Sequence, residues 1–98
     1  MSSYALSNAA AADLRQIVRH TIKQWGIEQA KRYIHSLTLA FDNLATFPET
    51  GRAASDIRQG YFRFDSGSHA VFYRKAAPGI LIMRVLHQRM QPEHHLPR

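Results

Sequence analysis

The chain has 98 residues, no cysteine and a formal net charge of +6 at pH 7. This length suits one domain over residues 1–98, and a hydrophobic content of 45% excludes global disorder. The absence of cysteine excludes disulfides and thiolate chemistry. No segment has the layout of a signal peptide or approaches the ~20 apolar residues of a membrane span. We therefore expect a cytoplasmic protein without membrane contact.

The positive charge is concentrated in the second half of the chain. Residues 1–49 hold five Lys/Arg against four Asp/Glu, whereas residues 50–98 hold eight against three and four of the six histidines. Two interpretations are open. The basic residues form a solvated surface that aids solubility, or they form a cationic sheet face that attracts nucleic acid or an acidic protein segment.

The N-terminal part predicts a short strand followed by a helix. Residues 4–6 are extended, and Ser7 or Asn8 is a suitable helix N-cap. Apolar residues then recur at helical spacing over residues 14–25 and form one stripe of an amphipathic helix. Gly26 is expected to end this helix.

A second amphipathic stripe runs over residues 30–45, and Pro48 ends it. The connection between the two stripes is so short that the helices should pack as an antiparallel hairpin. Trp25, Tyr33 and Phe41 fall on these stripes, so we expect them in the core, with Phe47 packed under the following loop.

The C-terminal half predicts a sheet. Residues 48–56 form a loop, and three strands follow as a meander at residues 57–64, 68–75 and 80–87. The last strand is nearly all apolar, so we place it centrally. The order β-α-α-β-β-β predicts an α+β fold, in which a short N-terminal strand and an antiparallel helical hairpin pack on a small, mainly antiparallel sheet. Residues 91–98 are expected to form a short flexible tail.

Several basic side chains are placed in or just beyond these apolar strands. A cation inside a strand is costly to bury unless it has a partner. Such residues therefore lie on an open face of the sheet or pair with an acidic group. The residues concerned are Arg63, Arg74, Arg84, His87 and Arg89.

Arg84 would be the most costly of these cations to bury without a partner, because it lies between Met83 and Val85 in the most apolar strand. Two arrangements are open: a carboxylate such as Asp65 or Glu49 pairs with it, or it opens to a binding face. Whether Arg63 and Arg74 share a face depends on a strand register that the sequence does not reveal.

The order of elements and four short motifs together resemble the ParE toxins, a branch of the RelE/ParE superfamily of type II toxin–antitoxin systems. The resemblance covers about residues 4–96. The motifs are Trp25-Gly26, Pro48-x-x-Gly51-Arg52, Gly67-Ser-His-x-Val-Phe-Tyr-Arg74 and Arg84-Val-Leu-His-x-x-Met90.

This resemblance implies a toxin that a ParD-like antitoxin neutralises and that inhibits DNA gyrase by stabilising its cleaved-DNA complex. The antitoxin would fill the groove between helical hairpin and sheet with a helix and an extended segment. No catalytic residue and no cofactor would be needed, because gyrase performs the chemistry. The resemblance places antitoxin or target contacts at Arg63, Arg74, Arg84, His87, Arg89 and Met90.

The RelE-like branch of the superfamily suggests an alternative, a ribosome-dependent mRNA endoribonuclease. His87 would act as acid or base, and three arginines would hold the phosphate: Arg63, Arg74 and Arg84. The nuclease set is incomplete, since no tyrosine follows His87 and Lys75 is the only lysine beyond Lys31. A third alternative is a toxin-fold protein that retains only antitoxin binding.

The histidines do not form a recognisable metal motif. His69 and His87 lack ligand spacing with carboxylates, and there is no cysteine. We expect His94 and His95 to be solvated. His69 begins a strand beside a Ser-Gly turn, where its ring could bond free backbone groups.

Overall fold

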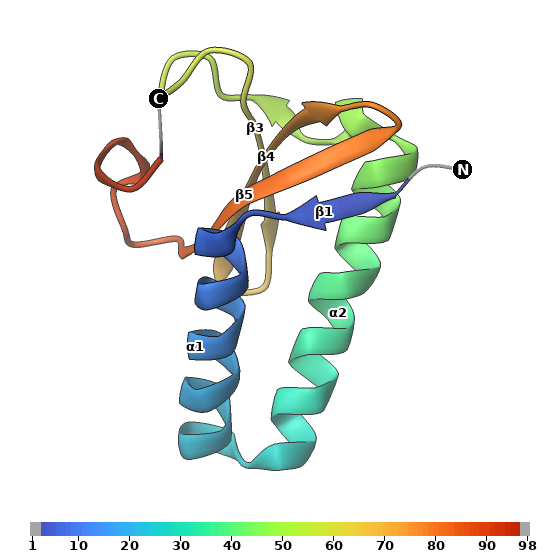
Figure 1. Cartoon of the computed structure of the whole chain (residues 1–98). Helices are drawn as coiled ribbons and strands as arrows, with labels where there is room; N and C mark the ends of the chain where they lie inside the picture. The colour runs from blue at the N-terminus through green and yellow to red at the C-terminus, as the bar shows by residue number, and fades with distance from the viewer. Residues whose placement is uncertain (1–2, 97–98) are drawn as a thin grey trace.

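The computed structural model describes residues 3–96 and forms one five-stranded sheet backed by two helices (Figure 1). The strands follow the order β1-β5-β4-β3-β2; β1 runs parallel to β5, and the other neighbours are antiparallel. The predicted fold class is therefore confirmed. The elements are β1 (Tyr4–Leu6), α1 (Asn8–Trp25), α2 (Ile27–Thr46), η1 (Pro48–Thr50), β2 (Arg52–Ala53), β3 (Phe62–Ser66), β4 (His69–Ala76), β5 (Gly79–His87) and η2 (Pro92–His94).

Local sequence determines the ends of the helices. The Ser7 hydroxyl accepts a hydrogen bond from the Ala10 amide at 3.0 Å and caps α1. Gly26 has a φ of 93°, which a residue with a side chain rarely adopts, and it both ends α1 and precedes α2. The predicted cap and helix stop are thus confirmed.

The central position of β5 is also confirmed, because this strand pairs with β1 on one side and with β4 on the other. Its buried residues belong to both faces of the sheet. Ile82 and Val85 face the helices, whereas Leu86 contributes to a second core on the far side. This burial on two faces is why the strand reads as a nearly continuous apolar run.

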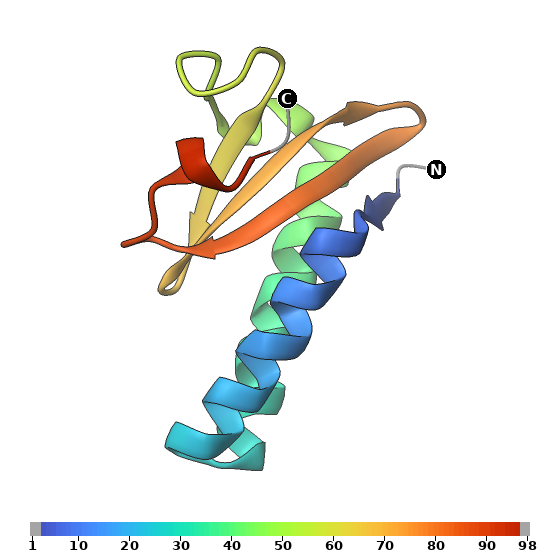
Figure 2. The same ribbon diagram turned by 60° about the vertical axis from the view of Figure 1, so that its left-hand side comes forward.

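The sheet separates two apolar cores. Figure 2 shows how the helices and the sheet are arranged in a second view. On the helical side, Leu37 and Phe41 of α2 pack against Tyr73 of β4. On the opposite side, the segment between β2 and β3 and the C-terminal segment cover Phe72, and Leu96 is buried there. Residues 91–96 were expected to form a flexible tail, yet they contain η2 and contribute to this core. Residues 97–98 lie outside the described part of the chain.

Two strand boundaries differ from the prediction. The strand expected over residues 57–64 begins only at Phe62, because the backbone turns before it. The amides of Ile57 and Arg58 both donate to the Ala54 carbonyl at 3.0 Å, and Gly60 has a φ of 84°. The expected loop over 48–56 in turn contains β2, which pairs with β3. Apolar and aromatic content thus signalled burial in this segment, but here burial did not require a strand.

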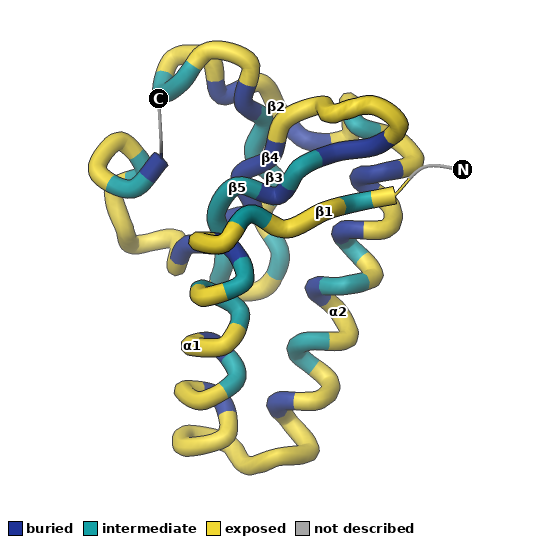
Figure 3. The backbone as a smooth tube through the Cα atoms, viewed as in Figure 1, coloured by how far each residue is buried: buried dark blue, intermediate teal, exposed yellow. Residues whose placement is uncertain are grey.

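The prediction for the aromatic residues was partly wrong. Phe41 is fully buried and Tyr33 packs against the core, as expected. Trp25 is 74% exposed and Phe47 is 64% exposed, which corrects the prediction. The far end of the helical hairpin projects beyond the sheet, so Trp25 has no opposing layer there (Figure 3). Among residues 3–96, no helix combines the length and apolar character that a membrane crossing requires.

Candidate functional site

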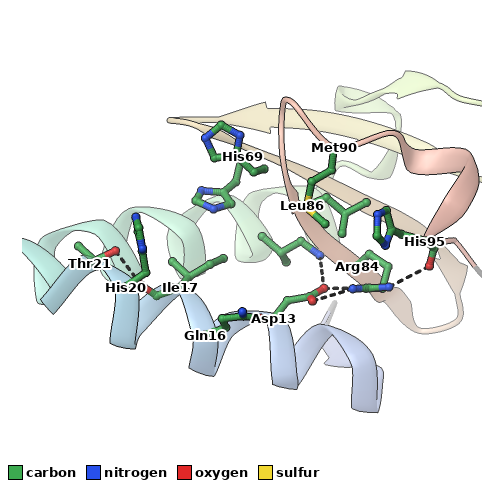
Figure 4. Close-up of a pocket in the computed structure, with 12 residues that line it drawn as sticks. Asp13, Gln16, Ile17, His20, Thr21, His69, Arg84, Leu86, Met90 and His95 are labelled. Carbon is green, nitrogen blue, oxygen red and sulfur yellow. Dashed lines mark hydrogen bonds and ion pairs between the residues drawn. The ribbon is translucent and has the colours of Figure 1, made fainter. Parts of the chain in front are cut away.

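A pocket of about 370 Å³ opens where α1 faces the C-terminal end of β5 (Figure 4). Four segments line it. Helix α1 contributes the largest share, β4 and β5 contribute the neighbouring histidines His69 and His87, and the C-terminal segment contributes Met90 and His95. Its apolar lining residues are Ile17, Val85, Leu86 and Met90. The pocket is thus lined by both apolar and titratable side chains.

Arg84 and Asp13 form an ion pair at one end of the pocket. Arg84 Nε and Nη2 each donate to a carboxylate oxygen of Asp13 at 2.8 Å. Arg84 Nη1 donates to the His95 carbonyl at 2.9 Å. The hydrogen bonds to Asp13 raise the pKa of Arg84 above its ordinary value. Arg84 is therefore paired internally, and its partner is Asp13 instead of Asp65 or Glu49.

Those two carboxylates are engaged elsewhere in the fold. Asp65 accepts a hydrogen bond from Arg63 at 2.8 Å, and Glu49 pairs with Lys75. The bond from Lys75 is the main reason that the pKa of Glu49 lies below its ordinary value.

The start of α1 takes the place of a neighbouring strand along part of β5. Strand β1 pairs only as far as Ile82. Beyond that point, the Ser7 hydroxyl donates to the Met83 carbonyl at 2.7 Å, and the Asp13 carboxylate accepts the Val85 amide at 2.9 Å. The side chains of Ser7, the N-cap of α1, and of Asp13 in α1 thus bond backbone groups at an edge of β5 that no strand covers.

The sequence also carries a signal for Asp13. Asp13 lies three residues after Ala10 and four before Ile17, and both of these are buried. A carboxylate on the buried stripe of a helix requires a partner, as does a guanidinium in an apolar strand.

His69 connects the sheet to the second helix. Its Nδ1 lies 2.6 Å from the phenolic oxygen of Tyr33, and its ring meets that of His87 edge-on at a centroid distance of 5.5 Å. Burial lowers the pKa of His69, and the positive charge of His87 and His20 lowers it further. His69 favours its neutral form at this position.

His69 was expected to bond free backbone groups at the turn before β4, and the structure shows Tyr33 in this role. The Ser68 amide donates to the Tyr33 oxygen at 2.9 Å, so the phenol and not the imidazole bonds the backbone of the β3–β4 turn. His69 holds that phenol in place. Tyr33 and His20 were not predicted at this site, because their proximity to His69 depends on how the helices pack on the sheet.

Arg63 and Arg74 lie on the other side of the sheet. Arg63 is opposite Phe72 in the strand register, and Arg74 follows Phe72 by two residues in β4, so all three share one face. The Arg63 guanidinium lies over the Phe72 ring at 5.5 Å from its centroid. Arg74 is exposed and has no hydrogen bond or ion pair with any other residue of the described range 3–96.

The remaining predicted residues lie at the pocket rim. His87 and Met90 line the pocket, and both are exposed. Arg89 is exposed beside them, and its amide donates to His87 Nδ1 at 3.2 Å. The six predicted binding residues therefore fall into two groups: Arg63 and Arg74 lie on the sheet face that carries Phe72, whereas Arg84, His87, Arg89 and Met90 lie at the pocket or beside it.

The residues that a nuclease would need do not converge. His87 lies opposite His69 in the register of β4 and β5. The preceding pair, Ala70 and Leu86, faces the second core, so His87 points to the helical side of the sheet. Arg63 and Arg74 face the opposite side, and Arg84 is bound to Asp13. Within residues 3–96, no three histidine, aspartate or glutamate side chains are placed to hold a metal ion.

Comparison with known proteins identifies the family. Residues 4–92 match the model of a family described as ParE toxin of type II toxin-antitoxin system, parDE. The chain is 44% identical over 96 residues to Toxin ParE1 of Mycobacterium tuberculosis, which covers 97% of this chain and 98% of that protein. It is 42% identical to Toxin ParE1 of Caulobacter vibrioides over 98% of this chain and 99% of that protein.

Solved structures show the same fold. The chromosomal ParDE system of Pseudomonas aeruginosa contains a chain that superposes with a TM-score of 0.74 at 21% identity, covering 89% of this chain and 96% of that one. A chain of the toxin–antitoxin complex RelBE2 of M. tuberculosis superposes with a TM-score of 0.61 at 20% identity, covering 89% and 98%. The match over residues 4–92 and the identity to the two ParE1 proteins place this chain in the ParE toxin family of type II toxin–antitoxin systems.

Proposed function

We propose that this toxin inhibits DNA gyrase by stabilising its cleaved-DNA complex and that a ParD-like antitoxin neutralises it. The observation that carries the proposal is the likeness to ParE1 toxins along nearly the whole chain. A gyrase-directed toxin needs a binding surface and no reaction centre of its own, because the target already cleaves and rejoins DNA.

The arrangement of the basic residues supports binding over catalysis. A nuclease must bring its acid, its base and its phosphate-binding cations to one phosphate. Here the sheet lies between His87 and the pair Arg63 and Arg74. Arg84 already has a carboxylate partner, so its charge is compensated within the chain.

We further propose that the antitoxin uses the two groups of residues differently. The pocket beside His87 and Met90 has apolar lining residues that suit an apolar anchor of the antitoxin. Arg74 and Arg89 are exposed and suit acidic side chains. Arg63 and Arg84 would shape these surfaces through their internal partners, Asp65 and Asp13.

The decisive experiment adds the purified chain to DNA gyrase, ATP and supercoiled plasmid, and then denatures the protein. We expect linear DNA in proportion to the toxin added, because a stabilised cleaved complex releases broken DNA when gyrase is unfolded. The ParD-like protein encoded beside the toxin should suppress this product. A reaction without gyrase is the control for a contaminating nuclease.

The variant His87→Ala separates this proposal from its alternative. If the toxin acts on gyrase, the variant still yields linear DNA, since gyrase performs the cleavage. If no linear DNA forms, and mRNA is lost in a translating lysate only with intact His87, the chain is a ribonuclease. Inertness in both assays with tight antitoxin binding would leave a protein that retains only the partner contact.

A further inference from the structure

The sheet face opposite the helices carries basic side chains from three neighbouring strands or loops. Arg52 lies directly opposite Arg63 in the register of β2 and β3, and Arg63 lies opposite Phe72 of β4. Side chains that are opposite each other in a sheet point to the same side, so Arg52 shares the face of Arg63 and Phe72. Ala54, two residues after Arg52, is buried with Phe72 in the second core, which agrees with this placement.

The ion pairs of the fold leave part of this positive charge without a partner. Like charges that are directly opposite in a sheet are destabilising. Asp65 compensates Arg63, whose Nε lies 2.8 Å from the carboxylate. Arg52 and Arg74 are exposed, and their side chains have no hydrogen bond or ion pair with any other residue of the range 3–96. Two exposed cations of this face are therefore available to an anion.

Arg58 adds a third positive charge from the segment between β2 and β3. Its guanidinium donates to the carbonyl oxygens of Ile57 at 2.8 Å and Glu93 at 2.9 Å, which are neutral acceptors and do not offset its charge. Burial raises the pKa of the Tyr61 phenol, and the positive charges of Arg74 and Arg58 oppose this effect. Both cations therefore lie close enough to Tyr61 to act on the same phenol.

A hollow of about 510 Å³ beside Arg74 gives this side of the sheet a concave part. Gln59, Tyr61 and Met83 are among the residues that line it. The side-chain amide of Gln59 and the guanidinium of Arg74 are hydrogen-bond donors that suit phosphate oxygens. We refer to these donors together as the cationic face, which consists of Arg52, Arg58, Gln59 and Arg74.

The aromatic side chains that point to this side of the sheet are not available to stack on bases. Phe72 and Tyr61 are 1% and 6% exposed, and the Arg63 guanidinium lies over the Phe72 ring. Proteins that bind single-stranded nucleic acid present exposed aromatic rings to the bases, whereas many contacts to a duplex are made with its phosphates. The cationic face therefore suits the backbone of a duplex better than unpaired bases.

A protein segment would need an apolar anchor as well as acidic side chains. Among residues 3–96, the exposed large apolar side chains lie on β1, on the helical hairpin, directly after α2 or beside His87. The cationic face itself offers charge and hydrogen-bond donors without an exposed apolar contact. This composition favours a ligand that is recognised through its phosphates.

We propose that the cationic face binds the phosphate backbone of duplex DNA without reading its sequence. A guanidinium forms two parallel hydrogen bonds with phosphate oxygens, and counterions released from the DNA add to the affinity. In the gyrase complex proposed above, the face would hold the DNA beside gyrase. This use rests on the proposed function, whereas DNA binding by the toxin alone does not.

Fluorescence anisotropy of a labelled DNA duplex of about 20 base pairs, titrated with the full chain between about 50 and 200 mM salt, tests the proposal. Three phosphate contacts should give a slope of about −3 when the logarithm of the binding constant is plotted against that of the salt concentration. Arg52→Gln and Arg74→Gln should each weaken binding severalfold and bring this slope about one unit closer to zero. Arg19→Gln removes the same charge from an exposed position of α1 and should leave the slope unchanged.

Asp65→Asn should have the opposite effect. The variant leaves Arg63 without its carboxylate partner, so a further guanidinium becomes available and DNA should bind severalfold more tightly. Asp42→Asn makes the same charge change at an exposed position of α2 and should not strengthen binding. Circular dichroism should show that all five variants are folded, since every substituted side chain is exposed.

The absence of duplex binding at about 50 mM salt would overturn the proposal, as would an equal loss of affinity in Arg19→Gln and in the two variants of the cationic face. A single strand or a glutamate-rich peptide whose binding depends on Arg52 and Arg74, while duplex binding does not, would also overturn it. The gyrase assay is a separate measurement. DNA binding without linear product contradicts only the gyrase proposal, whereas linear product without DNA binding by the toxin contradicts only this one.

Discussion

Arg84 is a charged side chain in the most apolar strand of the sheet, and its partner Asp13 stands 71 residues away in the chain. Side-chain exposures of 19% and 12% show that both charges are largely removed from water. Such a pair is strongly destabilised when only one partner is removed, because the remaining charge is then buried without compensation. Asp13 also accepts the Val85 amide, so it has two structural tasks.

The variant Asp13→Asn should lower the free energy of unfolding by about 2–3 kcal/mol, since it removes the charge opposite Arg84 and weakens three hydrogen bonds. Urea denaturation of the purified chain measures this loss. Asp42→Asn, an exposed position on α2, is the control and should change stability by less than about 0.5 kcal/mol. A similarly small loss for Asp13→Asn would mean that Arg84 is free to bind a partner.

At the scale of elements, the C-terminal segment is the part that sequence patterns described least well. Short polar stretches near a chain end carry little intrinsic structure. Here the segment is held by tertiary contacts: the Glu93 and His95 carbonyls accept hydrogen bonds from Arg58 and Arg84 at 2.9 Å. Leu96 is 5% exposed and packs in the core on the far side of the sheet.

We expect Leu96→Ala to destabilise the fold by about 2 kcal/mol, because it leaves a cavity in the second core. Thermal or urea unfolding gives the value. Leu39→Ala is the matched control, since Leu39 is half exposed on α2 and alanine is compatible with a helix. If both variants unfold like the original chain, the C-terminal segment frays in solution and does not contribute to the core.

At the scale of the whole molecule, His69 and Tyr33 join the helical layer to the sheet. The phenol bonds the His69 ring and the turn between β3 and β4. The ring lies near two other histidines, His20 and His87, and near one carboxylate, Asp13. Burial and the two histidines lower the pKa of His69, whereas Asp13 opposes this effect to a smaller extent.

This shift makes global stability depend on pH. The ordinary histidine pKa is 6.5, and that of folded His69 lies below it. As the pH falls through 6.5, the unfolded chain gains a proton that the folded chain does not, so the free energy of unfolding decreases until the folded pKa is passed. Urea denaturation between about pH 7.5 and pH 5 should show this decrease.

His69→Gln should reduce that pH dependence, because the substituted side chain does not titrate. His94→Gln, at an exposed position of the C-terminal segment, should leave it unchanged. An equal slope in the original chain and in His69→Gln would show that other groups determine the acid response.

Much of the fold followed from local patterns. Ser7 and Gly26 mark the helix ends, the two apolar stripes define the hairpin, and the continuous apolar run of β5 indicates its central place. These features depend on residues close together in the chain, where helical and strand periodicity are visible directly. The family motifs are local in the same sense, and the family match over residues 4–92 agrees with them.

The site was decided by packing between distant segments. The sequence left the partner of Arg84 open, and only the docking of α1 against β5 brought Asp13 to it. The placement of Arg63 and Arg74 on one face, away from His87, depended on a register that a one-residue slip would reverse. The exposure of Trp25 arose because the hairpin is longer than the sheet beneath it. Periodicity reveals which side of a helix is apolar, but only the tertiary structure shows whether another layer lies against it.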